Sequence, residues 1–275
     1  MTVRPLSGFG PDDRLAWTSP ADAPLTYPGV RPIVSCVLHR RRLLAVHASP
    51  GRPVGHWRVG PESASATPVP LDDFLRQAGA APTARRHPVL AIGSNASPAQ
   101  LHRKLSRAGC STTVPILRVE VQGLRVGVSA HISAAGYLPT SPVLEPAADE
   151  RLHLLLLDAD QLEAVDRTEP NYVRTFAPHT TVGAGLESGE VLGGVHVYAG
   201  RHGLLTDEEG LALRPADQHR LVSGLLARSV ALRAVMGETP EAFVTTAQNR
   251  PDARARGTEL FRTEGLVMTP RDLSR

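Results

Sequence analysis

The chain has 275 residues, of which 41% are hydrophobic and 21% charged, a composition typical of a folded globular protein and not of a disordered one. The formal net charge is +3, but the basic residues are scattered along the sequence, and Lys104 is the only lysine among 30 of them. Because a nucleic-acid-binding protein usually concentrates its basic residues on one face, we do not expect nucleic acid as a partner.

Membrane insertion and export are not expected either. The strongest apolar run, 152–157, is far shorter than the roughly 18 residues that a membrane-spanning helix needs. Residues 1–13 contain proline, glycine and two aspartates where a signal peptide requires a continuous apolar stretch. Cys36 and Cys110 lie in separate apolar segments without a metal-binding spacing, so they predict free thiols in a cytoplasmic protein.

Short β-prone runs dominate the first part of the chain. Residues 1–30 are rich in proline, glycine and aspartate and predict an irregular arm. The runs 33–38 and 43–47 predict a β-hairpin, and 55–59 predicts a third strand. Apolar residues at helical spacing predict a short helix over 71–79.

Three local signals follow one another from residue 88. Residues 88–92 form an apolar run that predicts a strand, and 93–96 predict a tight turn. Ser97 and Pro98 are then typical of the cap and the first position of a helix. The sequence therefore predicts a strand–turn–helix unit.

Further strands and helices are predicted downstream. The run 152–157 is almost wholly apolar, which is typical of a strand buried on both faces, and we place it at the centre of a sheet. A short helix capped by Asp158 is predicted over 158–166, and a long amphipathic helix over 215–236. Other apolar and β-branched runs predict four more strands, at 116–121, 125–132, 176–182 and 192–198.

These elements predict an α+β protein in three parts. Residues 1–86 contain too few apolar strands to bury a core alone, so we expect a small β-rich N-terminal extension that packs on the rest. Residues 87–236 form the main domain, and 237–275 form a C-terminal tail that wraps back through Phe243 and Phe261.

The first candidate site is the tetrapeptide Ile92-Gly93-Ser94-Asn95, at the end of the predicted strand. Gly93 permits either a close backbone approach or a positive φ, and the free N–H groups of such a turn can hold an anion. The same residue types also occur in ordinary strand-to-helix turns. The further glycines and the lysine of nucleotide-binding loops are missing.

The second candidate is Glu169, which follows the central strand and its helix. A carboxylate held beside apolar walls can act as a general base or acid. The alternative is a structural glutamate at the surface that pairs with Arg167 or Arg174.

Together, the two segments resemble the gamma-glutamylcyclotransferase family, over roughly residues 87–200. The family's opening signature is a strand that runs into Tyr-Gly-Ser-Asn and then a helix, and here it is Leu90 to Pro98 with Ile92 in place of the tyrosine. A tyrosine near the end of a later strand is matched by Tyr198. The second signature is an apolar strand, a helix, a glutamate, a tyrosine and an arginine, of which the last three are Glu169, Tyr172 and Arg174.

The resemblance implies a small mixed β-barrel with flanking helices around a cavity that binds a γ-glutamyl group as its small-molecule ligand. Glu169 would be the catalytic residue, which takes a proton from the α-amino group so that this nitrogen attacks the γ-carbonyl and releases 5-oxoproline. This chemistry needs no metal or organic cofactor. The substrate-binding residues would be Ile92, Gly93, Ser94, Asn95, Tyr172, Tyr198 and His131.

Several alternatives stay open at this point. His131 and Ser133 end a predicted strand where the family lines its cavity, but a buried structural histidine fits the same pattern. The histidine spacings do not predict a zinc site. Ile92, and Pro170 where the family often has glycine, are also compatible with a non-catalytic binding module or a domain that binds a partner enzyme. The oligomeric state is open.

Overall fold

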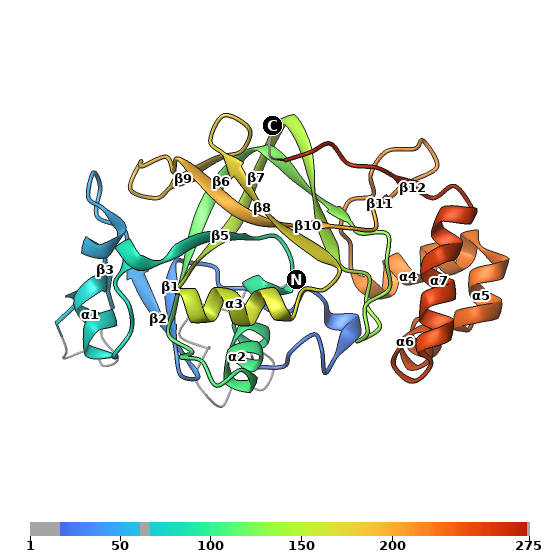
Figure 1. Cartoon of the computed structure of the whole chain (residues 1–275), viewed down its shortest axis with the longest axis horizontal. Helices are drawn as coiled ribbons and strands as arrows, with labels where there is room; N and C mark the ends of the chain where they lie inside the picture. Colours follow the sequence, from blue (N-terminus) through green and yellow to red (C-terminus); the bar gives the residue numbers. More distant parts are fainter. Residues whose placement is uncertain (1–16, 61–66, 274–275) are drawn as a thin grey trace.

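The fold is built on a mixed ten-stranded sheet with helices on both sides (Figure 1). The computed structural model describes residues 17–60 and 67–273, so the first part of the predicted arm lies outside the described residues. The strands are hydrogen-bonded in the order β4-β3-β2-β1-β6-β7-β5-β10-β8, with β9 on β6. All of these pairs are antiparallel except β5 with β10. The predicted α+β class is confirmed.

The strands and helices have the following bounds. The sheet contains β1 Cys36–His39, β2 Arg42–His47, β3 Arg58–Val59, β4 Val69–Pro70, β5 His87–Ala91, β6 Val114–Val128, β7 Thr140–Leu157, β8 Tyr172–Pro178, β9 Gly183–Leu186 and β10 Gly194–Gly200. A separate pair consists of β11 Leu204–Leu205 and β12 Val267–Met268. The helices are α1 Leu71–Gln77, α2 Pro98–Arg107, α3 Ala159–Arg167, α4 Gln218–Arg228, α5 Val230–Met236, α6 Pro240–Asn249 and α7 Pro251–Thr263. Within the described ranges, none of them is long and apolar enough to cross a bilayer.

The central hairpin differs from the prediction. The sequence predicted two strands, 116–121 and 125–132, but a single strand, β6, runs through both predicted strands to Val128, because the pairing with β7 continues past an irregularity at this point. Gly123 has a φ of +83° there, and the register with β7 shifts between Gln122 and Leu124. β7 is correspondingly long and begins at Thr140.

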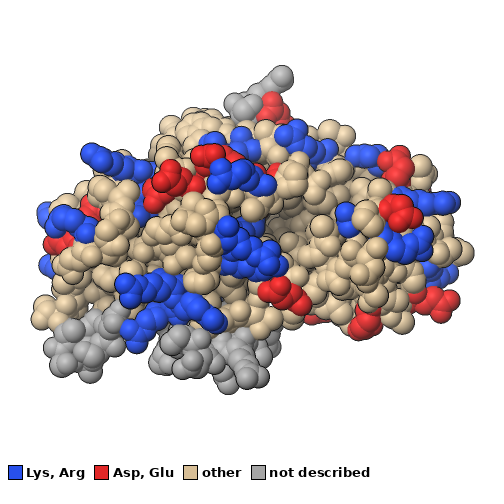
Figure 2. All heavy atoms as spheres, turned by 60° about the horizontal axis from the view of Figure 1, so that its bottom comes forward, with Lys and Arg blue, Asp and Glu red and all other residues tan. Residues whose placement is uncertain are grey.

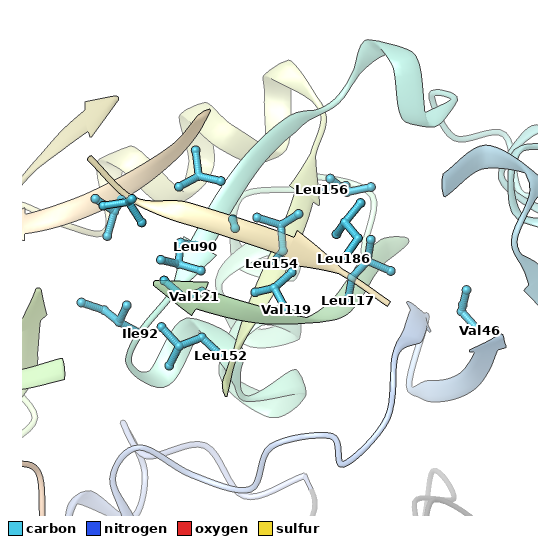
Figure 3. Close-up of a cluster of buried hydrophobic side chains, with 14 of the residues drawn as sticks. Val46, Leu90, Ile92, Leu117, Val119, Val121, Leu152, Leu154, Leu156 and Leu186 are labelled. Atoms are coloured by element: carbon cyan, nitrogen blue, oxygen red, sulfur yellow. The ribbon is translucent and has the colours of Figure 1, made fainter. Parts of the chain in front are cut away.

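The central position of the apolar run 152–157 is confirmed, because this part of β7 pairs with β6 on one side and β5 on the other. Its side chains alternate between two hydrophobic clusters. Leu152, Leu154 and Leu156 lie in the large cluster shown in Figure 3, whereas Leu155 and Leu157 pack with α2 and α3 on the other face. This pattern is typical of a strand buried on both faces.

The expected β-barrel is not closed. Among the described residues, β4 and β8 end the main path of paired strands, and no strand pairing joins them. The sheet is extended beyond the central strands by the N-terminal hairpin, whose β1 pairs with β6 over Cys36–Leu38. This hairpin occupies an edge of the central strands, so the sheet continues into the N-terminal region.

The C-terminal region is more helical than expected. The predicted helix over 215–236 is two helices, because Ser229 adopts an extended conformation and its Oγ accepts a hydrogen bond of 2.8 Å from the Leu232 N–H, which caps α5. Residues expected as a tail form α6 and α7, whose Phe243 and Phe261 are buried in one cluster with α4 and α5.

The N-terminal region shares its core with the central sheet. The predicted hairpin and helix are present as β1–β2 and α1, whereas the predicted strand over 55–59 is reduced to β3 because Val54–His56 form a 3₁₀ turn. Trp57 and Leu71 are fully buried in the same cluster as Leu154. The division of the chain into three parts stays a prediction that can be tested through this cluster.

We expect Leu71→Ala to lower the free energy of unfolding of the whole chain by about 2–5 kcal/mol, because it leaves a cavity in the shared cluster. The matched control is Leu211→Ala, since Leu211 is 60% exposed and its truncation should change stability by less than about 0.5 kcal/mol. Denaturant unfolding measures both. A separate early transition, with an unchanged main transition, would show that the N-terminal region folds independently.

Candidate active site

One cavity, of about 500 Å³, is lined by every site residue that the sequence indicated. It lies where the turn after β5, the loop between β6 and β7, the loop between α3 and β8, and an N-terminal segment around Tyr27 meet. Figure 2 shows a face of the molecule that is hollowed near its middle and on which acidic and basic side chains are interspersed. The residues brought together from the sequence prediction are Ile92, Gly93, Ser94, Asn95, His131, Glu169, Tyr172 and Tyr198.

The turn after β5 requires glycine because another chain segment comes close to it. Gly93 has a φ of −128°, so a positive φ is not the reason. A Cβ on Gly93 would lie 2.5 Å from the Tyr27 hydroxyl and 2.7 Å from Thr140 Oγ1. Contacts below 3 Å are not tolerated without movement of the neighbours. Of the two reasons that the sequence left open, close approach is the one that the structure supports.

Two backbone N–H groups of this turn are available to a ligand. Ser94–Ala96 form a single 3₁₀ turn in which the N–H groups of Ala96 and Ser97 donate to Gly93 O and Ser94 O, at 3.1 and 2.9 Å. Within the described part of the chain, no atom accepts a hydrogen bond from the N–H groups of Ser94 and Asn95. Because both residues line the cavity, they form a candidate cradle for an oxyanion.

Glu169 is held at the cavity wall by two donors. Its Oε1 accepts hydrogen bonds from Lys104 Nζ at 2.6 Å and from Asn95 Nδ2 at 2.9 Å. Its side chain is 15% exposed. The pairings with Arg167 and Arg174 that the sequence left open are not formed, because those arginines pair with Glu163 and Asp166.

Lys104 is a site residue that the sequence analysis missed. It lies on α2, its side chain is only 9% exposed, and its Nζ also donates to Asn95 Oδ1 at 2.8 Å. Asn95 therefore contacts both members of the Lys104–Glu169 ion pair. The sequence feature that could have indicated Lys104 is its composition, since this is the only lysine of the chain.

Tyr27 and Tyr137 were also missed. They come from different segments and stack with ring centroids 4.3 Å apart. The Tyr27 hydroxyl lies 2.9 Å from Thr140 Oγ1 and accepts a hydrogen bond from the Thr140 N–H at the same distance. Thr140 Oγ1 in turn donates to Ile92 O at 3.2 Å. Thr140 therefore links the N-terminal segment to the residue that follows β5.

The two tyrosines that the sequence indicated contribute their rings to the cavity. The Tyr172 hydroxyl donates to Thr140 O at 2.9 Å, and the Tyr198 hydroxyl donates to Asp166 Oδ1 at 2.7 Å. Burial raises the pKa of both phenols, so they are neutral at physiological pH. All four tyrosines of the chain line this one cavity.

His131 has the environment of a neutral, positioned imidazole. Burial lowers its pKa to about 3, and the neighbouring His202 acts in the same direction. Its Nδ1 lies 2.8 Å from Ser129 Oγ, and its ring lies 4.7 Å from that of His202. His131 can therefore offer a hydrogen bond but is not charged near neutral pH.

Apart from Arg103, the remaining lining residues are apolar or uncharged. Ile92 lies at the margin of the large hydrophobic cluster in Figure 3, and its side chain is buried there. Ser133 and Pro170 also line the cavity. In the described ranges no three His, Cys, Asp or Glu side chains are grouped closely enough to hold a metal ion.

Comparison with known proteins finds similarity among solved structures. No protein-family model matches the chain, and neither does any curated protein. A gamma-glutamyl cyclotransferase is 12% identical with a TM-score of 0.33, over 41% of this chain and 65% of its own length, less than two thirds. A protein from Arabidopsis thaliana is 20% identical (TM-score 0.35, covering 52% of this chain and 85% of that one). An uncharacterized protein from Homo sapiens is 11% identical (TM-score 0.35, covering 68% and 90%).

One of these structures bears the name of the family that the sequence signatures resemble. Identities of 20% or less and TM-scores of 0.35 or less assign neither an activity nor a ligand to this chain. The activity and the ligand have to be argued from the cavity.

We expect Gly93→Ala to destabilise the protein by about 1–3 kcal/mol, because the new methyl group displaces the Tyr27 hydroxyl from Thr140. Gly193→Ala is the matched control, since a Cβ there would meet no described atom within 4 Å. Denaturant unfolding of the two variants measures the difference. Equal stability of both would contradict the close approach at Gly93.

Proposed function

We propose that the protein is a gamma-glutamylcyclotransferase-like enzyme that cyclises a γ-glutamyl amine or amide and releases 5-oxoproline. One observation supports this above all: Glu169 lines the same cavity as Ser94 and Asn95, whose backbone N–H groups have no acceptor among the described residues. A base and an oxyanion cradle on one wall are the two elements that the reaction needs.

The free oxygen of Glu169 is suited to act as the base. Oε1 is occupied by Lys104 and Asn95, whereas no donor among the described residues contacts Oε2. Oε2 would take a proton from the α-ammonium group of the substrate. The freed amine then attacks the γ-carbonyl carbon. Glu169 gives its proton to the departing nitrogen as the bond between carbon and that nitrogen breaks. The attacking nitrogen loses its second proton to the carboxylate so regenerated and becomes the lactam N–H.

The modest size of this machinery fits an intramolecular reaction. The nucleophile and the carbonyl are tethered in the substrate, so ring closure to a five-membered lactam already has much of the proximity advantage. General acid–base catalysis contributes about 10²–10⁴ in rate, and one oxyanion donor about 10²–10³. The N–H groups of Ser94 and Asn95 would stabilise the oxygen that becomes negative during attack.

A binding module without catalysis is the second candidate. The observation that favours it is the Lys104–Glu169 ion pair, because a carboxylate with a buried cationic partner also occurs as a structural element. The two candidates differ in one measurable property, the release of 5-oxoproline from γ-glutamyl amines.

We expect Glu169→Gln to lower the turnover of γ-glutamyl amines by about 10²–10⁴, because the amide keeps the shape of the side chain but cannot accept the ammonium proton. The matched control is Glu163→Gln, since Glu163 is exposed on α3 and pairs only with Arg167 among the described residues. Chromatographic detection of 5-oxoproline gives the rates. A Glu169→Gln protein with most of the wild-type turnover would remove Glu169 as the base.

We expect the wild type to prefer γ-glutamyl conjugates of bulky, apolar amines over γ-glutamylalanine or glutathione. Ile92 makes one wall apolar, and burial of apolar surface contributes about 25 cal/mol per Å². Ile92→Tyr should reduce this preference, as measured by kcat/KM on both substrate types. Equal rates for both types in the wild type, unchanged by Tyr at position 92, would show that Ile92 does not set specificity.

A further inference from the structure

The only lysine of the chain lies in the candidate active site. The other basic residues among the 30 are all arginine, so composition alone would predict arginine at position 104 as well. The Lys104 side chain is buried except for 9% of its surface and points its Nζ at Glu169 and Asn95. A buried lysine in a chain that otherwise uses arginine requires a reason in its local environment.

The geometry of the carboxylate supplies that reason. Lys104 binds a single oxygen of Glu169, Oε1, and leaves Oε2 without a partner among the described residues. An arginine forms two parallel hydrogen bonds to a carboxylate and would engage both oxygens. Lysine therefore neutralises Glu169 without occupying its second oxygen, Oε2.

The lysine also keeps a donor of its own. An ammonium group has three N–H bonds, and two are directed at Glu169 Oε1 and Asn95 Oδ1, at 2.6 and 2.8 Å. No acceptor for the third N–H occurs among the described residues, and Lys104 lines the cavity. Within the described part of the chain, the ion pair thus keeps one unused donor, on Lys104, and one unused acceptor, on Glu169.

We propose that the Lys104–Glu169 pair is a receptor for an α-amino-acid zwitterion, in which Lys104 binds the α-carboxylate while Glu169 binds the α-ammonium group of the same carbon. This inference rests on the proposed function and names a residue for one part of its substrate: Lys104 as the cation that holds the α-carboxylate. The four charges alternate in sign around the contact, so each charged group has opposite charges as its nearest neighbours.

The other basic groups of the cavity do not serve this purpose. Arg103 lines the cavity but pairs with Asp22 at 3.2 Å. His131 is neutral near physiological pH, because burial lowers its pKa to about 3. Within the described lining of the cavity, Lys104 is therefore the cation that lies next to the base.

The test compares two substrates that differ only at the α-carboxylate: γ-glutamylbenzylamide and the same compound with an α-carboxamide. A hydrogen bond to a charged group contributes about 1.5–3 kcal/mol, so amidation should lower kcat/KM of the wild type about 10- to 100-fold, mainly through KM. Lys104→Met should lower kcat/KM for the substrate with the free α-carboxylate, so that the two substrates are turned over equally well. Arg107→Met, one turn further along the exposed side of α2, is the matched control and should keep the wild-type ratio.

A second experiment measures ligand binding to the wild-type protein, so it requires neither turnover nor a variant that folds. Because the chain has one lysine, an amine-reactive reagent labels only the side chain of Lys104 and the α-amino group of the polypeptide. Peptide mass spectrometry distinguishes these two labelled sites. In the wild type, 5-oxoproline should slow the labelling of Lys104, whereas 5-oxoprolinamide should not.

The outcomes separate this inference from the proposed function. Equal kcat/KM of the wild type for the α-carboxylate and the α-carboxamide substrate would overturn the role of Lys104 and leave the cyclising activity in place. Protection of Lys104 by 5-oxoproline alone, without turnover of any γ-glutamyl amine, would support Lys104 as a carboxylate receptor and overturn the enzyme. Absence of both protection and turnover would overturn both.

Discussion

The buried contact between Lys104 and Glu169 is the interaction on which the site depends. The two residues are 65 positions apart and lie on different segments, α2 and the loop after α3. They meet because β5 and β7 are adjacent strands and the helices that follow them, α2 and α3, pack on the same face of the sheet through one cluster. The sheet order thus brings the ion pair together, and the ion pair leaves Oε2 of Glu169 without a donor among the described residues.

The second constraint is the contact between Tyr27, Thr140 and the turn at Gly93. It joins the N-terminal segment, the start of β7 and the end of β5 through hydrogen bonds of 2.9 to 3.2 Å. Since Tyr27 also stacks on Tyr137, the N-terminal segment forms part of the cavity wall and does not merely cover the sheet. Tyr27 also places a hydroxyl beside Gly93, next to the position where Ile92 stands in place of a tyrosine.

Local signals in the sequence were sufficient for local structure. Asp158 caps α3 in a capping box with Gln161, and the strand before it has the continuous apolar pattern of a central strand. The signals failed where one residue type occurs in two structures. Gly123 lies at an irregularity within a continuous strand and not in a turn, and Ser229 divides a helical pattern. The site was predictable where it is encoded in short motifs. Lys104, Tyr27 and Tyr137 were not, because their positions depend on tertiary contacts between distant segments.

The energetics of the Lys104–Glu169 ion pair explain why these two residues are informative about function. Removing a lysine and a carboxylate from water costs several kcal/mol per ion, and their mutual attraction offsets this cost only with good geometry and further hydrogen bonds. Asn95 provides two of those bonds, yet one oxygen of Glu169 remains without a described donor. A pair of this kind is weak support for the fold. In the proposed complex, the zwitterion would satisfy the unused donor and acceptor, and the cost of burying the pair would become selectivity for that ligand.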